Sequence, residues 1–393
     1  MEDIVCSGCS LLCDDVVAEI DGKDLRSLGL CLLGYTRLNV ALKQKKTGSV
    51  DDKLVKAAEV LSSADRLLVY GFTNVSNEAV KEGMAIAKTL GAHFDSGASL
   101  GMTQAMNHSL HSSKLEVDLE YVRNNGELII YWGSDPAESV HRHPSRFAVL
   151  PRGDKIPEGV ESRTIGVVDV RETETMKMAN HRMILPIGSD IEFIQALIGE
   201  LDGSASITSP VLGIPAAEVI GLVSGFKKAD CTVIFYGSGI LNSGKSDENL
   251  SAISQLVETI RKTGKEAYAL PMYPESNLMG VITASKNIEN SLPKIIANDY
   301  THVLVVGDDP LMTLPGPAAK ALAKSKIVYI GPEGGVTDKR AQVSVHTTDL
   351  ILQGSEKMTR LDQVEIEFKP WKGIEKANTT HEVLKKLHNL VKK

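Results

Sequence analysis

Four of the five cysteines in this chain lie within its first 31 residues, at a spacing that could hold a metal centre. Cys6, Cys9 and Cys13 follow one another at short intervals, and Cys31 comes later. Three closely spaced thiolates plus one distant thiolate are a recurrent ligand set of [4Fe–4S] clusters. A tight group of cysteines in a reducing compartment favours metal binding over disulfides. The sequence therefore predicts a [4Fe–4S] cluster ligated by these four thiolates.

Two alternatives remain open for the four cysteines. Zinc is the main rival, although structural zinc sites favour two closely spaced cysteine pairs. The group could also be an unligated remnant of a metal site. The fifth cysteine, Cys231, precedes an apolar run and is predicted to be a core thiol rather than a ligand.

Polar residues follow two apolar, strand-like runs in a similar order. One run ends in Gly133-Ser134-Asp135-Pro136 and the other in Gly307-Asp308-Asp309-Pro310. Glycine at the carboxyl end of a strand lets a ligand approach the backbone, and the amides that follow can bind phosphate. The same residues are also typical of a simple turn. Both interpretations stay open from the residues alone.

Two further polar groups could contact an anionic ligand. Asp169 and Arg171 end another run, where the acid could hold a ribose or pterin hydroxyl and the arginine a phosphate. Arg142, His143 and Arg146 also follow a strand and turn, and they suggest anion contact. The alternative for the second group is a solvated helix face.

The region between Leu54 and Asp349 must position these groups, and it alternates short apolar runs with helical stretches. This alternation predicts parallel strands that helices cover on both faces. The predicted strands are Leu67–Tyr70, Leu128–Tyr131, Thr164–Val168, Thr232–Tyr236, Ala267–Leu270, His302–Val306 and Lys326–Ile330.

An internal repeat is visible in the same region. Leu128–Pro136 parallels Val303–Pro310, and each is followed by a second strand. Leu68–Gly71 and Val233–Gly237 match more weakly. Repeats on this scale suggest two related nucleotide-binding-like halves. The tail after Gly354 differs, with a hairpin or edge strand predicted at Arg360–Lys369 and an amphipathic helix at His381–Leu390, packed on the core or on a partner.

Composition sets the outer limits. The chain has 393 residues, 42% apolar and 24% charged, which suggests two or three globular domains. A net charge of -7 disfavours nucleic-acid binding, which needs a basic surface. No apolar run has the roughly 20 residues that a membrane span needs. The acidic opening Met1-Glu2-Asp3 lacks the features of a signal peptide, so we expect a cytoplasmic protein without a membrane partner.

Taken together, these segments resemble the B-type subunit of formylmethanofuran dehydrogenase, a member of the molybdopterin oxidoreductase superfamily. The resemblance runs over nearly the whole chain. The segments that carry it are Val5–Asp15, Cys31–Gly34, Tyr131–Pro136, Arg142–Arg146, Val167–Thr173, Phe235–Ile240 and Leu270–Met272.

The resemblance implies an α/β fold of two interleaved Rossmann-like parallel-sheet domains, with a small N-terminal iron–sulfur domain and without the C-terminal barrel of the superfamily. The implied domains are 1–50 for the cluster, 51–100 with 266–350 for the first α/β domain, 101–265 for the second, and 351–393 for a C-terminal tail. The family reversibly reduces CO2 to formate in methanogenesis and related one-carbon metabolism, and a partner subunit condenses the formate onto methanofuran.

The family cofactor is molybdopterin guanine dinucleotide with molybdenum or tungsten, which sits between the two α/β domains. The implied cofactor-binding residues are Gly133, Ser134, Asp135, Arg142, His143, Asp169, Arg171, Gly237, Gly307 and Asp308. The implied partners are A-, C- and D-type subunits, which bind the methanofuran-type carrier.

The chain departs from the family at three positions that carry the redox chemistry. Gly101 stands where a cysteine or selenocysteine would bind the metal, and Met102 stands where a histidine would follow it. Tyr273 follows Pro271-Met272 where the family has an active-site arginine. Glycine offers no ligand to a metal, and methionine cannot carry a proton near neutral pH. No catalytic residue is therefore expected at this degenerate site.

Three functions follow from this mixture of matches and departures. The first is a B-type subunit without redox function, a scaffold in a formyltransferase/hydrolase-type complex, as in relatives from methylotrophic bacteria. The second is an active molybdenum or tungsten bis-pterin formate/CO2 oxidoreductase whose metal takes a non-protein ligand. The third is an iron–sulfur electron-transfer or assembly module with other partners.

Overall fold

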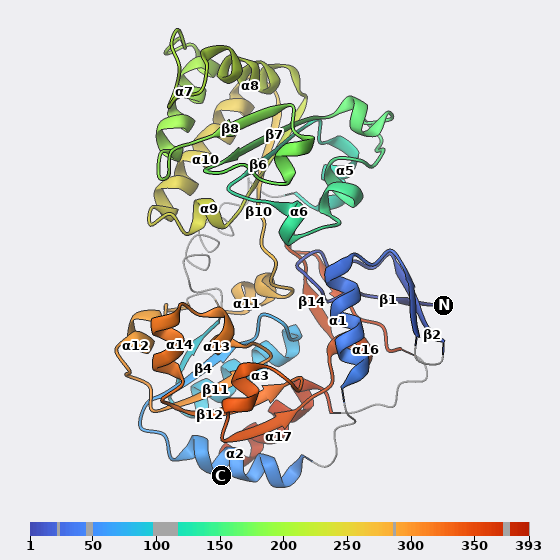
Figure 1. Ribbon diagram of the computed structural model, residues 1–393, viewed down its shortest axis with the longest axis vertical. Coiled ribbons are helices and arrows are strands. Elements are labelled where there is room, and N and C mark those ends of the chain that lie inside the picture. Colours follow the sequence, from blue (N-terminus) through green and yellow to red (C-terminus); the bar gives the residue numbers. More distant parts are fainter. Residues whose placement is uncertain (22–23, 45–49, 97–116, 286–287, 372–377, 393) are drawn as a thin grey trace. The chain divides into compact units, whose positions relative to one another are not determined.

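The computed structural model of the protein describes residues 1–393 except 22–23, 45–49, 97–116, 286–287, 372–377 and 393 (Figure 1). The chain forms two compact units. Unit 1 combines Met1–Thr103 with Glu275–Lys393, and unit 2 is Gln104–Pro274. The finer predicted boundaries, with a separate cluster domain and a separate tail, stay a prediction. Among the described helices, none is both long and apolar enough to cross a lipid bilayer.

Unit 2 is built on a parallel five-stranded sheet with the order β10-β9-β6-β7-β8. Central strand β6 is buried at every residue, as expected for a strand covered on both faces. The strands are β6 (Leu128–Trp132), β7 (Thr164–Asp169), β8 (His181–Ile184), β9 (Cys231–Tyr236) and β10 (Glu266–Pro271). The helices are α5 (Leu119–Asn125), α6 (Pro136–Ser139), α7 (Asp190–Asp202), α8 (Ala216–Lys228), α9 (Ser238–Leu241) and α10 (Ser246–Lys262), with short turns η2 (Pro144–Ala148), η3 (Gly159–Ser162) and η4 (Thr175–Met178).

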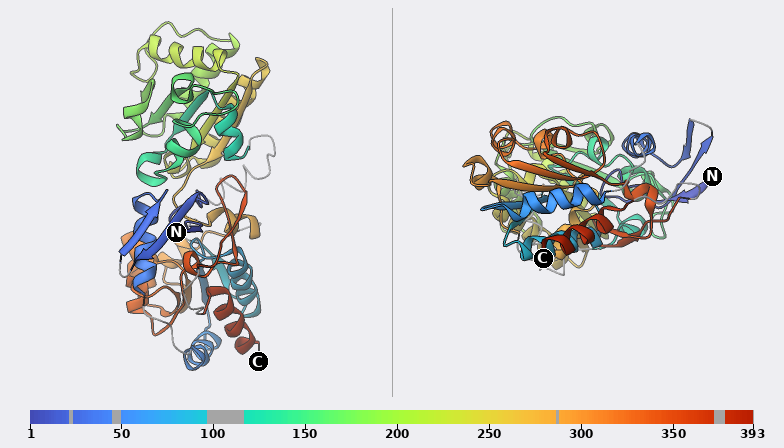
Figure 2. Two further views of the ribbon diagram at one scale, coloured as in Figure 1. Left: turned by 90° about the vertical axis from the view of Figure 1, so that its right-hand side faces the viewer. Right: turned by 90° about the horizontal axis from the view of Figure 1, so that it is seen from below.

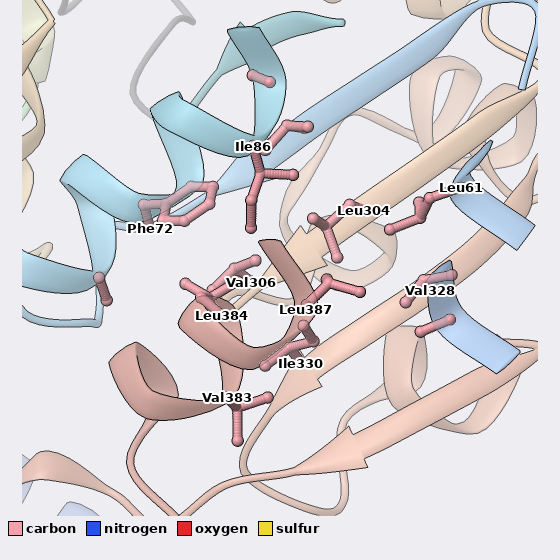
Figure 3. Close-up of a cluster of buried hydrophobic side chains, with 14 of the residues drawn as sticks. Leu61, Phe72, Ile86, Leu304, Val306, Val328, Ile330, Val383, Leu384 and Leu387 are labelled. Carbon is pink, nitrogen blue, oxygen red and sulfur yellow. The ribbon is translucent and has the colours of Figure 1, made fainter. Parts of the chain in front are cut away.

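Unit 1 contains a second parallel five-stranded sheet with the order β13-β12-β11-β4-β5. Its strands are β4 (Leu67–Gly71), β5 (His93–Asp95), β11 (His302–Val306), β12 (Lys326–Gly331) and β13 (Val343–His346). Its helices are α2 (Asp51–Ser62), α3 (Asn77–Thr89), α11 (Leu278–Ala284), α12 (Leu292–Ile296), α13 (Pro310–Thr313), α14 (Gly316–Leu322), α15 (Val336–Arg340) and α17 (Thr380–Val391). Apolar side chains of α2, α3 and α17 cover one face of this sheet (Figure 3).

The N-terminal segment adds an antiparallel sheet to unit 1. It consists of β1 (Glu2–Ile4), β2 (Val16–Asp21) and β3 (Asp24–Leu28), and helix α1 (Leu32–Lys43) follows. Near the other end of the chain come α16 (Leu350–Gln353) and the hairpin of β14 (Lys357–Thr359) and β15 (Glu365–Glu367). Figures 1 and 2 show the blue N-terminal segment beside this red hairpin.

The internal repeat is confirmed by the order of the strands. Each sheet contains three strands that are consecutive in sequence and lie side by side, β6 to β8 in unit 2 and β11 to β13 in unit 1. The first of these three strands also pairs with a strand from another part of the chain. That partner is β9 in unit 2 and β4 in unit 1, and each continues to an edge strand, β10 or β5. The two sheets therefore have the same parallel topology.

All seven predicted strands are present, and the predicted terminal helix is α17. Edge strands β5, β8 and β13 were not predicted, because they are short and only partly buried, and so lack a continuous apolar run. The hairpin or edge strand predicted at Arg360–Lys369 is confirmed in part, because β15 (Glu365–Glu367) lies within that range. Its partner β14 (Lys357–Thr359) precedes the predicted range, and residues 360–364 form the turn. The alternating apolar residues fit the predicted strand positions as well as the observed ones. The packing of Met358 and Ile366 in the core selects the observed positions.

The packing of α17 makes a first testable prediction. Leu384 is fully buried between α17 and the sheet of unit 1. We expect Leu384→Ala to lower the free energy of unfolding by about 2–5 kcal/mol, because truncation of a buried leucine leaves a cavity. Urea titration would measure the loss. Lys385→Ala, one residue away and exposed, is the matched control and should change stability little. Equal stability of both variants would show that α17 does not pack as described.

Candidate functional site

The first candidate site is the loop that carries Cys6, Cys9 and Cys13. The three side chains are buried, each 5% exposed. The loop closes on itself, because the Cys6 N–H donates to the Cys13 carbonyl at 2.9 Å. Leu12 turns the chain through a left-handed conformation (φ 42°), and its N–H donates to the Cys9 carbonyl. Thus three thiols that are close in sequence are enclosed in one short loop.

Cys31 approaches from the start of helix α1. It is the N-cap residue, and its carbonyl accepts a hydrogen bond from the Tyr35 N–H at 2.8 Å. Cys31 is partly exposed, in contrast to the three loop cysteines.

The four cysteines interact electrostatically. Burial raises the pKa of the Cys6 thiol, and the neighbouring Cys13, Cys9 and Cys31 sulfurs raise it further, whereas the Gly8 N–H lowers it. The fourth cysteine therefore lies close enough to the loop to affect its charge. Several thiolates gathered in a buried place repel one another unless a cation compensates their charge.

Two glycines, which the sequence analysis did not select, allow this approach. A Cβ on Gly34 would lie 2.7 Å from the Cys6 Sγ, and a Cβ on Gly8 would lie 2.9 Å from the Gly34 Cα. Any larger residue at either position would push helix α1 away from the loop. The interval from Cys31 to Gly34 could have indicated this contact, because it places the glycine one helical turn after the cysteine.

Within the part of the chain that the structure describes, no group of three or more His, Cys, Asp or Glu side chains is arranged to hold a single metal ion. The four thiols also form no disulfide. The donor set is thus four thiols, of which Cys6 interacts electrostatically with the other three.

The second candidate site is the carboxyl end of the unit 2 sheet. Gly133 has a left-handed conformation (φ 56°), and a Cβ there would lie 2.9 Å from the Gly239 Cα. A Cβ on Gly237 would lie 2.5 Å from the Gly133 carbonyl oxygen and 2.7 Å from the Ser134 Cβ. These glycines bring the loops after β6 and β9 into backbone contact. Their small size is therefore used for packing within the chain.

The Asp135 carboxylate links this strand end to the loop after β7. It accepts hydrogen bonds from the Glu174 N–H, the Thr175 N–H and the Thr175 hydroxyl, the last at 2.5 Å. The Thr175 Oγ1 in turn accepts from the Ala137 N–H at 3.3 Å. The strand end and the following loop are therefore fastened by one acid and one threonine.

Unit 1 repeats this arrangement with the same kinds of donor and acceptor. Asp309 accepts hydrogen bonds from the Val336 N–H, the Thr337 N–H and the Thr337 hydroxyl, at 2.7, 2.8 and 2.5 Å. The Thr337 Oγ1 accepts from the Leu311 N–H at 3.1 Å. We call these two arrangements, Asp135 with Thr175 and Asp309 with Thr337, the aspartate–threonine clasps. The sequence did not predict these pairs, because each threonine lies far along the sequence from its aspartate.

Asp308 lies beside the unit 1 clasp and is bonded within the chain as well. Its carboxylate accepts from the Thr73 hydroxyl at 2.9 Å and from the Asn74 Nδ2 at 2.6 Å. Burial raises the pKa of Asp308. Burial also raises the pKa of Glu275, and the Asp308 charge adds to that rise. The Glu275 Oε2 is buried and has no hydrogen-bond partner among the described residues.

The remaining predicted contacts in unit 2 fall into two environments. His143 is fully buried, and its Nδ1 lies 3.1 Å from the Tyr131 hydroxyl. Burial lowers the pKa of His143 to about 3, so the ring is neutral near pH 7. Asp169 and Arg171 lie nearer to solvent. Burial raises the pKa of Asp169, and the Arg171 guanidinium, whose side chain is 58% exposed, lies 3.4 Å from Glu138.

Arg142 is half-buried, and its carbonyl accepts hydrogen bonds from the Arg146 N–H at 2.8 Å and from the Ser145 hydroxyl at 3.2 Å. Of the three degenerate positions, Gly101 and Met102 lie outside the described residues. Tyr273, the third, is buried, with 1% exposure.

With this geometry established, comparisons with known proteins identify relatives. No family model matches the chain. It is 26% identical over 407 residues to the B subunit of the tungsten-containing formylmethanofuran dehydrogenase 2 of Methanocaldococcus jannaschii, and the match covers 94% of this chain and 93% of that protein. It is 24% identical over 258 residues to the protein of that name in Methanococcus maripaludis, with 62% and 59% covered.

A solved structure shares the fold. It is the formyltransferase/hydrolase complex FhcABCD of Methylorubrum extorquens with methylofuran, matched with a TM-score of 0.66 at 13% identity over 88% of this chain and 97% of the matched chain. The protein is therefore an α/β protein with the two-sheet fold found in that complex. In sequence it is a distant homologue of the B subunit of formylmethanofuran dehydrogenase, which belongs to an oxidoreductase complex.

The half-buried acid Glu275 leads to a prediction about pH. An acid whose pKa is raised by folding binds its proton more tightly in the folded chain. Its favourable contribution is present below the unfolded pKa, near about 4.3, and is lost as the pH rises through the higher folded value. We therefore expect Glu275→Gln to gain stability relative to the parent chain as the pH rises from about 4 to about 7.

Urea titrations followed by Trp371 fluorescence would measure this gain. Trp132→Phe, introduced into every variant, leaves Trp371 as the reporter in unit 1. Glu367→Gln, which changes an exposed carboxylate, is the control and should show no such dependence. A stability difference between Glu275→Gln and the parent chain that stays constant between the two pH values would contradict the assignment.

Proposed function

We propose that this chain is the B-type subunit of a formylmethanofuran dehydrogenase-type complex in one-carbon metabolism. In this proposal it carries a [4Fe–4S] cluster on Cys6, Cys9, Cys13 and Cys31. Its redox site is degenerate, and it serves as a scaffold, as in formyltransferase/hydrolase complexes. The full-length similarity to the B subunit of the Methanocaldococcus jannaschii enzyme supports the subunit type.

The spacing and chemistry of the donors support a cluster over a zinc ion. Three closely spaced thiols with a fourth further along the chain are typical of [4Fe–4S] ligands, whereas structural zinc sites favour two closely spaced cysteine pairs. Cys6 also interacts electrostatically with the other three cysteines, so the four thiols lie near one another. When bound, the cluster would supply one-electron redox capacity and would compensate the charge of the thiolates.

The observation that carries the scaffold role is the pair of aspartate–threonine clasps. Asp135 and Asp309 stand at the strand ends where a nucleotide-like cofactor would bind, and both carboxylates already bond threonines of the chain. Gly133 and Gly237 pack against backbone, and His143 is enclosed. These groups do not fit the contacts expected for a molybdopterin, so we derive no catalytic step through that cofactor. The clasps hold the fold whether or not a cofactor is present.

The degenerate positions support the same conclusion. Gly101 provides no sulfur ligand for molybdenum or tungsten. Tyr273 stands where the family has a positively charged arginine. The structural relative belongs to a four-subunit complex with methylofuran. By analogy we propose A-, C- and D-type partners for this chain, and we propose that these partners bind the one-carbon carrier.

Elemental analysis of the anaerobically purified complex tests this function. We expect about four iron atoms per chain, because that is the content of one [4Fe–4S] cluster, without molybdenum or tungsten. Cys9→Ala should lose iron and the thiolate-to-iron absorbance. Cys231→Ala, which removes a buried thiol far from the loop in sequence, is the control and should keep both.

Each competing function predicts a different result. Molybdenum or tungsten with two pterins would replace the scaffold role by an active bis-pterin oxidoreductase. Zinc in place of iron, or iron unchanged in Cys9→Ala, would refute the cluster. Iron without a co-purified A-type subunit would favour an electron-transfer or assembly module.

A further inference from the structure

We infer that Ser276 is a positioning residue for the cysteine loop. It fixes the orientation of the Ser7–Gly8 peptide, whose N–H donates a hydrogen bond to the Cys6 sulfur. This inference rests on the proposed cluster. It starts from a hydrogen bond between residues 269 positions apart. The Ser276 hydroxyl donates to the Ser7 carbonyl at 2.6 Å, and its second acceptor, the Asn74 Oδ1, lies further away at 3.3 Å. Both residues are nearly inaccessible, with 2% and 1% exposure. A buried bond of this length holds the Ser7 carbonyl in one direction.

The direction of that carbonyl determines where the next N–H points. The peptide between Ser7 and Gly8 is trans, so its carbonyl and its N–H point in opposite directions. On the far side, the Gly8 N–H donates to the Cys6 Sγ at 3.3 Å. A relay therefore runs from the Ser276 hydroxyl through one peptide plane to the sulfur. Rotation of this peptide would break both bonds together.

Ser276 is itself held firmly. The N–H of its neighbour Asn277 donates to the Thr73 carbonyl at 2.7 Å, and the Asn277 Nδ2 donates to the Val75 carbonyl at 2.7 Å. The Asn277 Oδ1 accepts from the Thr359 N–H of the hairpin at 2.8 Å. The serine is thus fixed to the loop after β4 and to β14 before it contacts the cysteine loop.

The cysteine loop is supported from a second direction at Ser10. The Ser10 carbonyl accepts from the Leu361 N–H at 3.1 Å, in the turn of the β14–β15 hairpin. In that turn Arg360 and Asp362 form a buried two-bond ion pair at 2.7 Å. Apolar side chains of the loop and of the C-terminal segment also pack together. This hydrophobic core consists of Val5, Leu12, Leu350, Met358, Ile366 and Phe368. These supports fix the rest of the loop, and Ser276 orients the Ser7–Gly8 peptide.

The functional consequence concerns the reduction potential of the cluster. Hydrogen bonds to ligand sulfurs withdraw electron density and raise the potential of iron–sulfur clusters. By holding the Gly8 N–H on the Cys6 sulfur, Ser276 would therefore raise the reduction potential of the cluster. Loss of the hydroxyl frees the peptide to rotate and weakens the N–H bond to the sulfur.

The test is a redox titration of the full chain, followed by visible absorbance and electron paramagnetic resonance. Wild-type iron content is measured first, and a wild-type chain without iron overturns the proposed cluster and this inference together. With iron present, Ser276→Ala should have a more negative midpoint potential than the wild type. Ser285→Ala is the matched control, because Ser285 is similarly buried and its hydroxyl donates to the Val281 carbonyl of α11 instead of the cysteine loop.

A wild-type potential in Ser276→Ala would overturn the inference while the cluster assignment stands. If Ser276→Ala does not retain iron, Ser276→Thr decides, because threonine restores the hydroxyl with one added methyl group. Iron and a wild-type potential in Ser276→Thr support the relay. Iron lost from both variants but kept in Ser285→Ala overturns it, because shape rather than the donor would then matter.

Discussion

Unit 1 depends on the parallel pairing of β4 with β11. This register joins Leu67–Gly71 to His302–Val306, two segments separated by the whole of unit 2 in sequence. Closing so long a loop costs entropy, and the burial of every residue in both strands offsets that cost. Because the two strands end side by side, Thr73 and Asn74 reach Asp308, and the segment after residue 274 reaches the cysteine loop. Without this pairing the proposed cluster ligands would lose most of their support.

In each of the two sheets, an aspartate–threonine clasp joins a strand end to a later loop, and it does so without a ligand. In each half, the acid follows a left-handed glycine, and the threonine begins the helix or turn after the next strand. These partly buried acceptors are costly to leave unpaired, so each threonine stabilises its own strand end. This framework is the physical basis for the proposed scaffold role.

The cysteine loop packs against later segments of unit 1. Its carbonyls accept from Ser276 and Leu361, and its apolar residues pack on the β14–β15 hairpin. Metal binding by a short loop is coupled to folding. In this protein that coupling would extend to the hairpin and to the start of α11. A cluster on a chain without redox chemistry would then still contribute to the stability of unit 1.

The sequence by itself determined the elements whose information is local. Continuous apolar runs predicted the seven strands, and the repeat predicted two related halves. The spacing of the N-terminal cysteines predicted a common metal centre, which stays a prediction. Only the tertiary structure decided the partners of polar groups. Asp135 and Gly133 suit a ligand site or a turn equally well in sequence, and distant Thr175 and Gly239 show that each is used within the chain. Ser276 carries no pattern of its own, because a hydrogen bond across 269 residues depends on strand pairing and not on neighbouring sequence.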